Sequence, residues 1–236
     1  IDIYRQDYTI WDGALLPEVV RQLEADYAGT VYYDRYIKGL WTQAEGLVYP
    51  DAHDAEEPRY AGEADRWAVS CDYGTQNAFA ALLWAYADGV WHVVREYRYS
   101  GRDTGHQKTD ADYVADMRAF LGDLPQDTPF IIDPSATSFH AAMRRGGFVV
   151  RKARNAVEDG IRETASCMAQ GIVKYADDLP ELKKEFAGYV WDSASNGDKP
   201  VKENDHLMDA LRYGVATLRM WKPAEKYVSP FERGVR

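Results

Sequence analysis

The distribution of apolar and polar positions changes near residue 66. From there, three stretches rich in apolar, β-branched and aromatic residues follow one another, at 67–74, 78–86 and 90–100. The last two are separated only by the turn-forming sequence ADG at 87–89. Strands joined by such short connections pair with their neighbours along the chain, so this part of the sequence predicts a three-stranded antiparallel meander.

After the meander, segments with helical spacing of apolar residues alternate with short apolar runs. In order, they are helix 110–122, strand 129–133, helix 137–147, strand 148–153, helix 156–171, strand 172–175 and helix 178–189. Such alternation is typical of sheets whose strands are joined by helices. We therefore expect an α/β fold with a mixed central sheet, part meander and part parallel strands, and with helices on both faces.

The ends of the chain differ from this middle part. Residues 1–60 form a lead-in or linker segment with one predicted helix at 15–29. We assign residues 61–221 to the main domain and residues 222–236 to a flexible C-terminal tail. Within the main domain, the sequence at 189–202 predicts a β-hairpin whose loop contains an Asn-Gly pair.

Composition sets limits on function. The chain has 236 residues, 46% of them hydrophobic, which is enough for a packed core. Its net charge of −10 argues against a dedicated nucleic-acid coat protein, which would be basic. There is no signal peptide and no apolar run long enough to span a membrane, and Cys71 and Cys167 lack the spacing of a zinc site. A reducing, cytoplasmic setting follows, and the absence of an initial Met predicts a fragment of a longer protein.

Two predicted strands end in an aspartate. Asp72 follows the apolar run WAVSC, and Asp133 follows PFII. The carboxyl ends of neighbouring parallel strands are where open α/β sheets bind ligands, whereas antiparallel pairing would separate the two acids. The long segment of chain between the two strands permits parallel pairing. We therefore predict that these two strands are parallel neighbours.

A third group of polar residues opens the last predicted helix, Asn204 to Met220. Asp205, His206 and Asp209 share one helix face by their spacing of three and four residues. Asp209 lies inside the helix and cannot be its cap. Asp205 could equally be an N-cap, and an isolated His206 would have an ordinary surface or packing role.

The whole set suits a metal site. Any one aspartate has an ordinary structural explanation, but acids on two strand ends and a helix, in that order, are harder to explain separately. Carboxylates are the ligands of Mg²⁺ or Mn²⁺, and a histidine adds tolerance for Mn²⁺. Two such ions can activate a water molecule and stabilise the leaving oxygen of a phosphodiester.

One stretch of the acidic chain is locally basic. It contains Arg144, Arg145, Arg151, Lys152 and Arg154, with no acid among them. An ordinary solvated surface would explain this stretch equally well. If the chain binds DNA, we expect phosphate contacts from Arg144, Arg145, Lys152, Arg154 and Lys202, which would give affinity without sequence preference.

Three segments in this order resemble the nuclease domain of the large terminase subunit of tailed bacteriophages, a member of the ribonuclease H-like superfamily. They are SCDYGTQNAFAALLW, FIIDPSATSF and ENDHLMDALRYG, and the lead-in and the 151–175 region are also similar, so the resemblance spans about residues 4 to 220. It implies a ribonuclease H-like fold in which Asp72, Asp133 and Asp209 are catalytic metal ligands. His206 and Asp205 would be accessory ligands.

The resemblance also implies function. We expect a Mg²⁺- or Mn²⁺-dependent endonuclease, with two ions, that cuts concatemeric double-stranded viral DNA during genome packaging in the host cytoplasm. The full-length protein would include an ATPase motor and would work with the portal and the small terminase subunit. This chain lacks the G-x-x-x-x-G-K-[ST] phosphate loop of such a motor, so it corresponds to the nuclease part.

Three alternatives remain open at this level. A Holliday-junction resolvase or transposase core would use the same acids on branched DNA. An actin-like or sugar-kinase ATPase shares a similar sheet, and DYGTQN superficially fits its phosphate turn. A packaging scaffold without enzymatic activity would bind no metal.

Overall fold

The computed structural model describes residues 9–13, 15–28, 32–40, 44–74, 77–194 and 198–219. The expected tail at 222–236, the Asn-Gly pair of the expected hairpin and Met220 at the end of the last predicted helix lie outside these residues.

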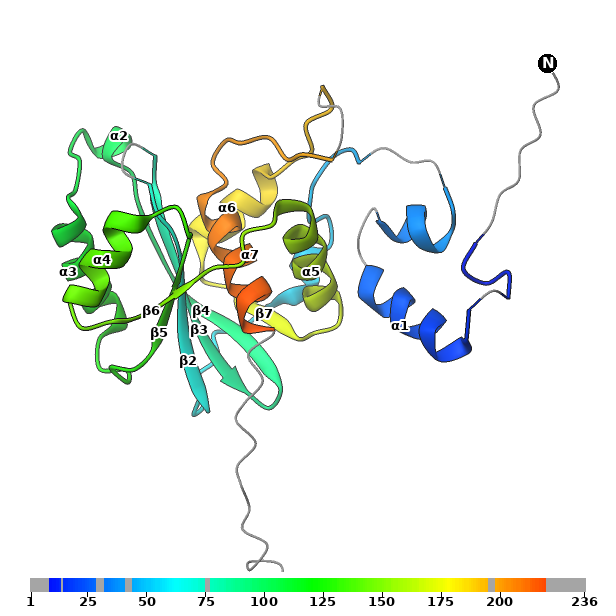
Figure 1. Cartoon of the computed structure of the whole chain (residues 1–236), viewed down its shortest axis with the longest axis horizontal. Helices are drawn as coiled ribbons and strands as arrows, with labels where there is room; N and C mark the ends of the chain where they lie inside the picture. The colour runs from blue at the N-terminus through cyan, green and yellow to red at the C-terminus, as the bar shows by residue number, and fades with distance from the viewer. Residues whose placement is uncertain are drawn as a thin grey trace, which may run out of the picture.

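One mixed sheet forms the centre of the molecule (Figure 1). Its order is β1-β7-β4-β3-β2-β5-β6. The strands are β1 (Glu56–Glu57), β2 (Arg66–Asp72), β3 (Phe79–Ala87), β4 (Val90–Tyr99), β5 (Pro129–Ile132), β6 (Val149–Lys152) and β7 (Val173–Ala176). The pairs β2–β3 and β3–β4 are antiparallel, and all other pairs are parallel. Both the predicted meander and the predicted parallel pairing of β2 with β5 are confirmed.

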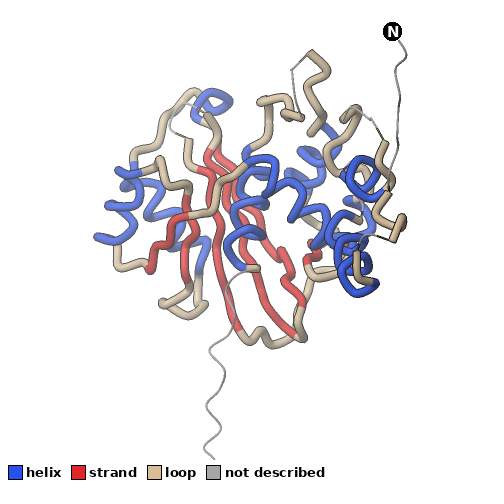
Figure 2. Tube along the Cα trace, turned by 45° about the vertical axis from the view of Figure 1, so that its right-hand side comes forward, coloured by secondary structure: helices blue, strands red, loops and turns tan. Residues whose placement is uncertain are grey.

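Helices cover both faces of this sheet, as predicted. On one face lie α3 (Asp110–Leu121) and α4 (Thr137–Arg145), and on the other lie α5 (Val157–Ala169), α6 (Pro180–Gly188) and α7 (His206–Leu218) (Figures 1 and 2). A short helix, α2 (Gly101–Thr104), follows the end of β4. Each face has its own apolar core, and the core under α5, α6 and α7 is the larger of the two.

Helix α7 lies directly against the sheet because Gly214 allows it. A Cβ atom at this position would lie 2.3 Å from Cζ2 of Trp84, which is fully buried on β3 and whose Nε1 donates a hydrogen bond to Ser70 Oγ at 2.8 Å. Ordinary contacts between carbon atoms are roughly 3.5–4.0 Å, so no side chain fits between helix and ring. This close approach fixes the position of α7 over β2 and β3.

The lead-in contains α1 (Pro17–Tyr27), a π-helical turn at Tyr33–Ile37 and a 3₁₀ turn at Ala52–Ala55. The predicted helix at 15–29 is therefore present, but it has no buried residue, and Leu16 beside it is 63% exposed. By contrast, residues 44–57 belong structurally to the sheet and its larger core, because Tyr49 is buried there and β1 pairs with β7.

The expected hairpin at 189–202 is present only as a short pairing. Trp191 and Pro200 form an isolated bridge, flanked by backbone hydrogen bonds from Asp192 to Lys199 and from Val201 to Val190. No helix among the described residues is both long and apolar enough to cross a membrane.

Candidate active site

The two strand-end acids leave the sheet side by side. In the parallel pair of β2 and β5, Cys71 is opposite Ile132. Asp72 ends β2 and Asp133 directly follows β5, so both acids lie at the carboxyl edge of neighbouring parallel strands. This is the position at which open α/β sheets bind ligands.

Helix α7 connects these two acids. Its first residue, His206, shares a hydrogen bond with Asp72, with 2.9 Å between Nδ1 and Oδ2. Near the middle of the helix, the hydroxyl group of Tyr213 donates to Oδ2 of Asp133 at 2.8 Å. Asp209 lies between these two positions and accepts a hydrogen bond from Arg212 at 2.7 Å. The three predicted catalytic acids therefore all lie on α7 or in hydrogen-bonding contact with it.

Burial sets the protonation behaviour of this region. It raises the pKa of Asp72 to about 6, and the negative charge of Asp209 adds to the effect, while the hydrogen bond from His206 opposes it. The hydrogen bond with Asp72 in turn raises the pKa of His206. For Asp133, burial is outweighed by hydrogen bonds from the backbone of Ser135 and from Tyr213, which lower its pKa.

Asp205 does not cap α7 with its side chain. It occupies the N-cap position, but its carboxylate makes no capping hydrogen bond. The cap is Glu185 from α6, whose Oε2 accepts from the backbone N–H groups of Leu207 at 2.7 Å and Met208 at 3.2 Å. Of the two alternatives for Asp205, the structure therefore does not support the cap, because a buried acid from another helix already accepts from these N–H groups. Burial and the charge of Asp209 raise the pKa of Asp205.

A cavity of about 390 Å³ opens over these residues. Its lining includes Asp72, Asp205, His206 and Asp209, together with Lys202 from the predicted set of phosphate contacts. Asp133 does not line this cavity, and it contacts α7 through the hydrogen bond from Tyr213. Side chains from β2 and from the start of α7 therefore form its acidic wall.

The residue types fit a hard divalent cation, but their present positions do not enclose one. Among the residues that the structure describes, no three or more His, Cys, Asp or Glu side chains are arranged to hold a metal ion. Each acid is instead bonded to a neighbour: Asp72 to His206, Asp133 to Tyr213 and Asp209 to Arg212. Burial, together with the charge of Asp209, raises the pKa of Asp72, and a bound cation would favour the charged carboxylate.

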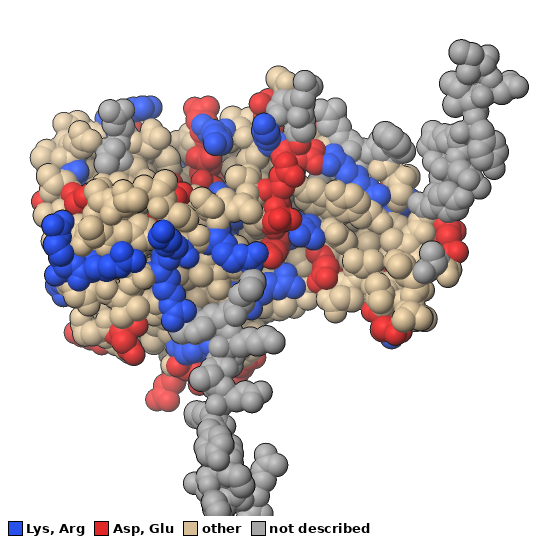
Figure 3. All heavy atoms as spheres, in the orientation of Figure 1, with Lys and Arg blue, Asp and Glu red and all other residues tan. Residues whose placement is uncertain are grey.

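The basic stretch lies away from the cavity. Arg144 and Arg145 form the exposed last turn of α4, Lys152 ends β6, and Figure 3 shows lysines and arginines gathered over this part of the molecule. Arg154 bonds to the end of α7: its backbone N–H donates to Thr217 Oγ1 at 3.1 Å, and its guanidinium donates to the carbonyl of Ala216 at 3.3 Å. None of these four basic residues lines the cavity of the acids.

Sequence reasoning missed three residues of the site. Tyr213 and Arg212 could have been found, because they follow Asp209 by four and three residues and so share its helix face. Glu185 had no local signal, since it belongs to a different helix and meets α7 only through tertiary packing.

Comparison with known proteins agrees with this fold. The structure matches the large terminase of a thermophilic bacteriophage in complex with ADP, with 41% sequence identity and a TM-score of 0.81 over 87% of this chain and 53% of that chain. The P22 large terminase nuclease domain matches at 20% identity and a TM-score of 0.61 over 75% of this chain and 95% of that one. The large terminase nuclease from the thermophilic phage G20c with bound cobalt matches at 15% identity and a TM-score of 0.59, over 74% and 99% of the two chains.

A curated relative gives the same result from sequence. The terminase large subunit of Escherichia phage T5 is 23% identical over 161 residues, which is 65% of this chain and 35% of that protein. No family model matches. The fold is the ribonuclease H-like fold of the terminase nuclease domains. In particular, the chain resembles the nuclease domain of phage large terminase subunits, and it spans about half the length of the ADP-bound large terminase.

Proposed function

We propose that this chain is a divalent-cation-dependent endonuclease that cuts double-stranded viral DNA during genome packaging. The observation that carries the proposal is that one helix, α7, contacts both strand-end acids. His206 of α7 is hydrogen bonded to Asp72, and Tyr213 of α7 donates a hydrogen bond to Asp133. Asp209 lies on α7 between these two residues. The sequence relationship to the ADP-bound large terminase supports the same function.

Each residue has a distinct part in the proposal. Asp72, Asp133 and Asp209 would hold one or two Mg²⁺ or Mn²⁺ ions, with Asp205 and His206 as accessory ligands. Ions of this kind, when bound, activate a water molecule and stabilise the charge that develops on the leaving oxygen of a phosphodiester.

The remaining chemistry is that of the chain itself. His206 orients the carboxylate of Asp72 through its Nδ1 contact. Tyr213 fixes the carboxylate of Asp133 and keeps it ionised, since its hydrogen bond lowers the pKa of that acid. Arg212 is buried and holds Asp209 while it offsets its negative charge.

The partners of the full-length protein are part of the proposal. A motor domain, a portal and a small terminase subunit would bring concatemeric DNA to the site in the host cytoplasm. Phosphate contacts from Arg144, Arg145, Lys152, Arg154 and Lys202 would hold the duplex without reading its sequence. Because the chain is acidic, we expect its isolated affinity for DNA to be weak and sensitive to salt.

Plasmid cleavage tests the assignment of the acids. Asp72→Asn and Asp209→Asn should abolish Mn²⁺-dependent nicking, because a neutral amide is a poorer ligand for a hard cation than a carboxylate is. Asp54→Asn is the matched control, since this aspartate is exposed and lies outside the site. Circular dichroism and thermal melting would verify that all three variants fold. Cleavage at the wild-type rate by Asp72→Asn would overturn the assignment.

A substrate comparison separates the proposal from its alternatives. We expect linear and plasmid duplexes to be cut at least as well as a four-way junction. Preference for the junction would indicate a resolvase, and ATP turnover without cleavage would indicate the actin-like alternative. Calorimetry with Mn²⁺ addresses the scaffold alternative, which predicts no binding.

A further inference from the structure

We propose that Arg98 is a phosphate-binding residue on the wall of the cavity opposite the acids, in contact with the DNA backbone. The inference rests on the proposed nuclease function and names part of its substrate site. The sheet register provides the first argument. Asp72 of β2 is opposite Ala80 of β3, and Ala80 is opposite Arg98 of β4.

Residues directly opposite each other in antiparallel strands direct their side chains to the same face of the sheet. Asp72, Ala80 and Arg98 therefore form one row on the face covered by α6 and α7. Neighbouring strands are about 4.8 Å apart, so the backbones of Asp72 and Arg98 are separated by roughly 10 Å. Between them lies the fully buried Ala80, whose side chain is only a methyl group.

Arg98 and Asp72 line the same cavity, and Arg98 also lines a neighbouring cavity of about 380 Å³. The two cavities share Glu203 and Asn204 as well, so they meet at one short border. In this proposal, one phosphate of the DNA backbone lies at the acids and a neighbouring phosphate lies at this border. Arg98 stands at this position.

Arg98 has two acidic neighbours. Its Nη1 atom lies 3.3 Å from Asp103, and its Nε atom lies 3.9 Å from the buried Glu185. The carboxylate of Asp103 is 60% exposed, so its pairing with Arg98 contributes little and is easily exchanged. A phosphate oxygen could take the place of Asp103, because the guanidinium fork matches the geometry of phosphate.

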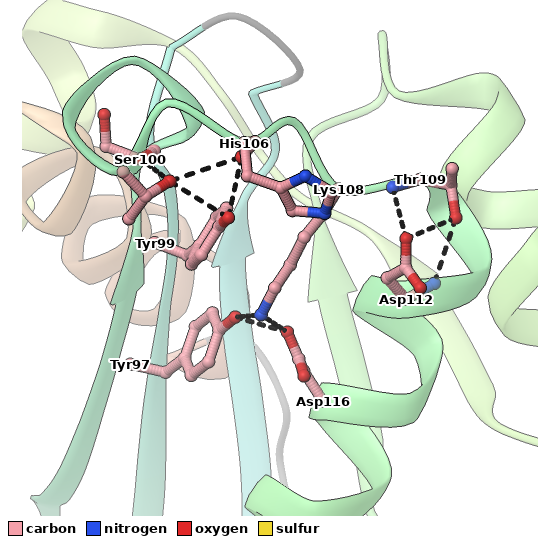
Figure 4. Close-up of polar contacts among 9 residues, drawn as sticks. Tyr97, Tyr99, Ser100, His106, Lys108, Thr109, Asp112 and Asp116 are labelled. Carbon is pink, nitrogen blue, oxygen red and sulfur yellow. Dashed lines mark hydrogen bonds and ion pairs between the residues drawn. The ribbon is translucent and has the colours of Figure 1, made fainter.

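A second arginine lies on the same side. Arg102 is exposed, lines the same cavity, and belongs to the segment 100–109 between β4 and α3. Both ends of this segment are anchored, as Figure 4 shows. Near its start, Tyr99 donates a hydrogen bond to the carbonyl of His106 at 2.7 Å.

At the end of the segment, Lys108 Nζ lies 2.5 Å from Asp116 Oδ2, and Tyr97 donates to the same carboxylate oxygen at 2.5 Å. Thr109 and Asp112 then form a capping box that begins α3 (Figure 4). The segment is therefore held in a defined position, and Arg102 is presented at the cavity by a fixed turn. Arg102 and Lys202 also line the cavity, so each could contact a DNA phosphate beside the one at Arg98.

The salt dependence of DNA binding tests this inference directly. Each phosphate contact contributes about 0.9 to the slope of the logarithm of the binding constant against the logarithm of salt concentration. In EDTA, with a short fluorescent duplex and the whole 236-residue chain, Arg98→Ala should lower this slope by about 0.9. Arg98→Lys should restore it, because lysine retains the point charge. Arg102→Ala should also lower the slope. Because Arg102 is exposed, this second variant tests the inference even if Arg98→Ala impairs folding.

The matched control is Arg59→Ala. Arg59 pairs with Asp178 at the surface, and neither residue lines the cavity. Its removal changes the net charge equally and should leave the slope unchanged. The inference would be overturned if Arg98→Ala and Arg102→Ala had the same slope as the wild type. It would also be overturned if the wild type showed no measurable binding at low salt.

Cleavage with Mn²⁺ separates this inference from the proposed function. For Arg98→Ala we expect a higher KM with little change in kcat, since a backbone contact made before and during the reaction is uniform binding. A wild-type chain that binds with an Arg98-dependent slope but never cuts would contradict the nuclease proposal alone. A wild-type chain that cuts, with a KM unaffected by Arg98→Ala, would contradict the role of Arg98 alone.

Discussion

Glu185 of α6 accepts a hydrogen bond from the backbone of Leu207 at 2.7 Å, so the first turn of α7 is capped by a residue from another helix. The first N–H groups of a helix have no partner within it, and Glu185 supplies the missing acceptor. His206 and Asp209 belong to this capped turn. The position of the acidic wall therefore depends on how α6 packs against α7.

The first prediction concerns this cap. Glu185→Ala removes the acceptor and leaves the N–H groups of Leu207 and Met208 buried without it, which should lower the free energy of unfolding by about 1–3 kcal/mol. Glu185→Gln keeps an acceptor oxygen of the same shape and should lose much less. Urea unfolding in EDTA measures both. An alanine variant as stable as the wild type would show that the cap is dispensable.

The second prediction concerns the pH dependence of stability. Burial raises the pKa of Glu185 from 4.5 to about 7. Between these values the folded chain binds a proton that the unfolded chain has released, so the contribution of Glu185 to stability is complete below about 4.5 and is lost as the pH rises through 7. A difference of this size corresponds to roughly 3 kcal/mol.

Glu185→Gln cannot release a proton and should lack this part of the pH dependence. Urea unfolding of wild type and variant from about pH 5 to pH 8, in EDTA, gives the difference directly. The stability of the variant relative to the wild type should increase as the pH rises. A constant difference across this range would contradict the raised pKa.

Local pattern was sufficient to predict the strands β2 to β7, but not β1, which lies in the segment predicted to be a linker. The runs before Asp72 and Asp133 identify two strands, and the spacing of Asp205, His206 and Asp209 identifies one helix face. The cap could not be predicted, because Glu185 is 20 residues before Asp205 and nothing local links the two. Likewise, the apolar spacing of α1 predicts a helix but not whether its apolar face is buried, which depends on what packs against it.

The third prediction tests the close packing of α7 on the sheet. Gly214→Ala would place a Cβ atom 2.3 Å from the ring of Trp84. The ring is buried and hydrogen bonded to Ser70, so moving it aside would cost packing and hydrogen-bond energy. Overpacking of this kind costs about 1–3 kcal/mol. Gly188→Ala is the control, because a Cβ atom there meets nothing within 4 Å. Thermal melts of the two variants should differ clearly, and equal stability would mean that α7 can shift outward freely.

The fourth prediction concerns Tyr213, which reaches Asp133 through its hydroxyl group alone. Tyr213→Phe removes the 2.8 Å hydrogen bond to the carboxylate but keeps the buried ring. Loss of a partner that orients a metal ligand typically costs roughly 10–100-fold in metal affinity or activity, so Mn²⁺ binding by calorimetry and plasmid nicking should both weaken by about this factor. Tyr60→Phe is the matched control, since its hydroxyl group bonds to the backbone of Glu63, outside the cavity. Unchanged Mn²⁺ affinity in Tyr213→Phe would mean that Asp133 is held in place without α7. The hydrogen bond between Tyr213 and Asp133 would then have no role in metal binding.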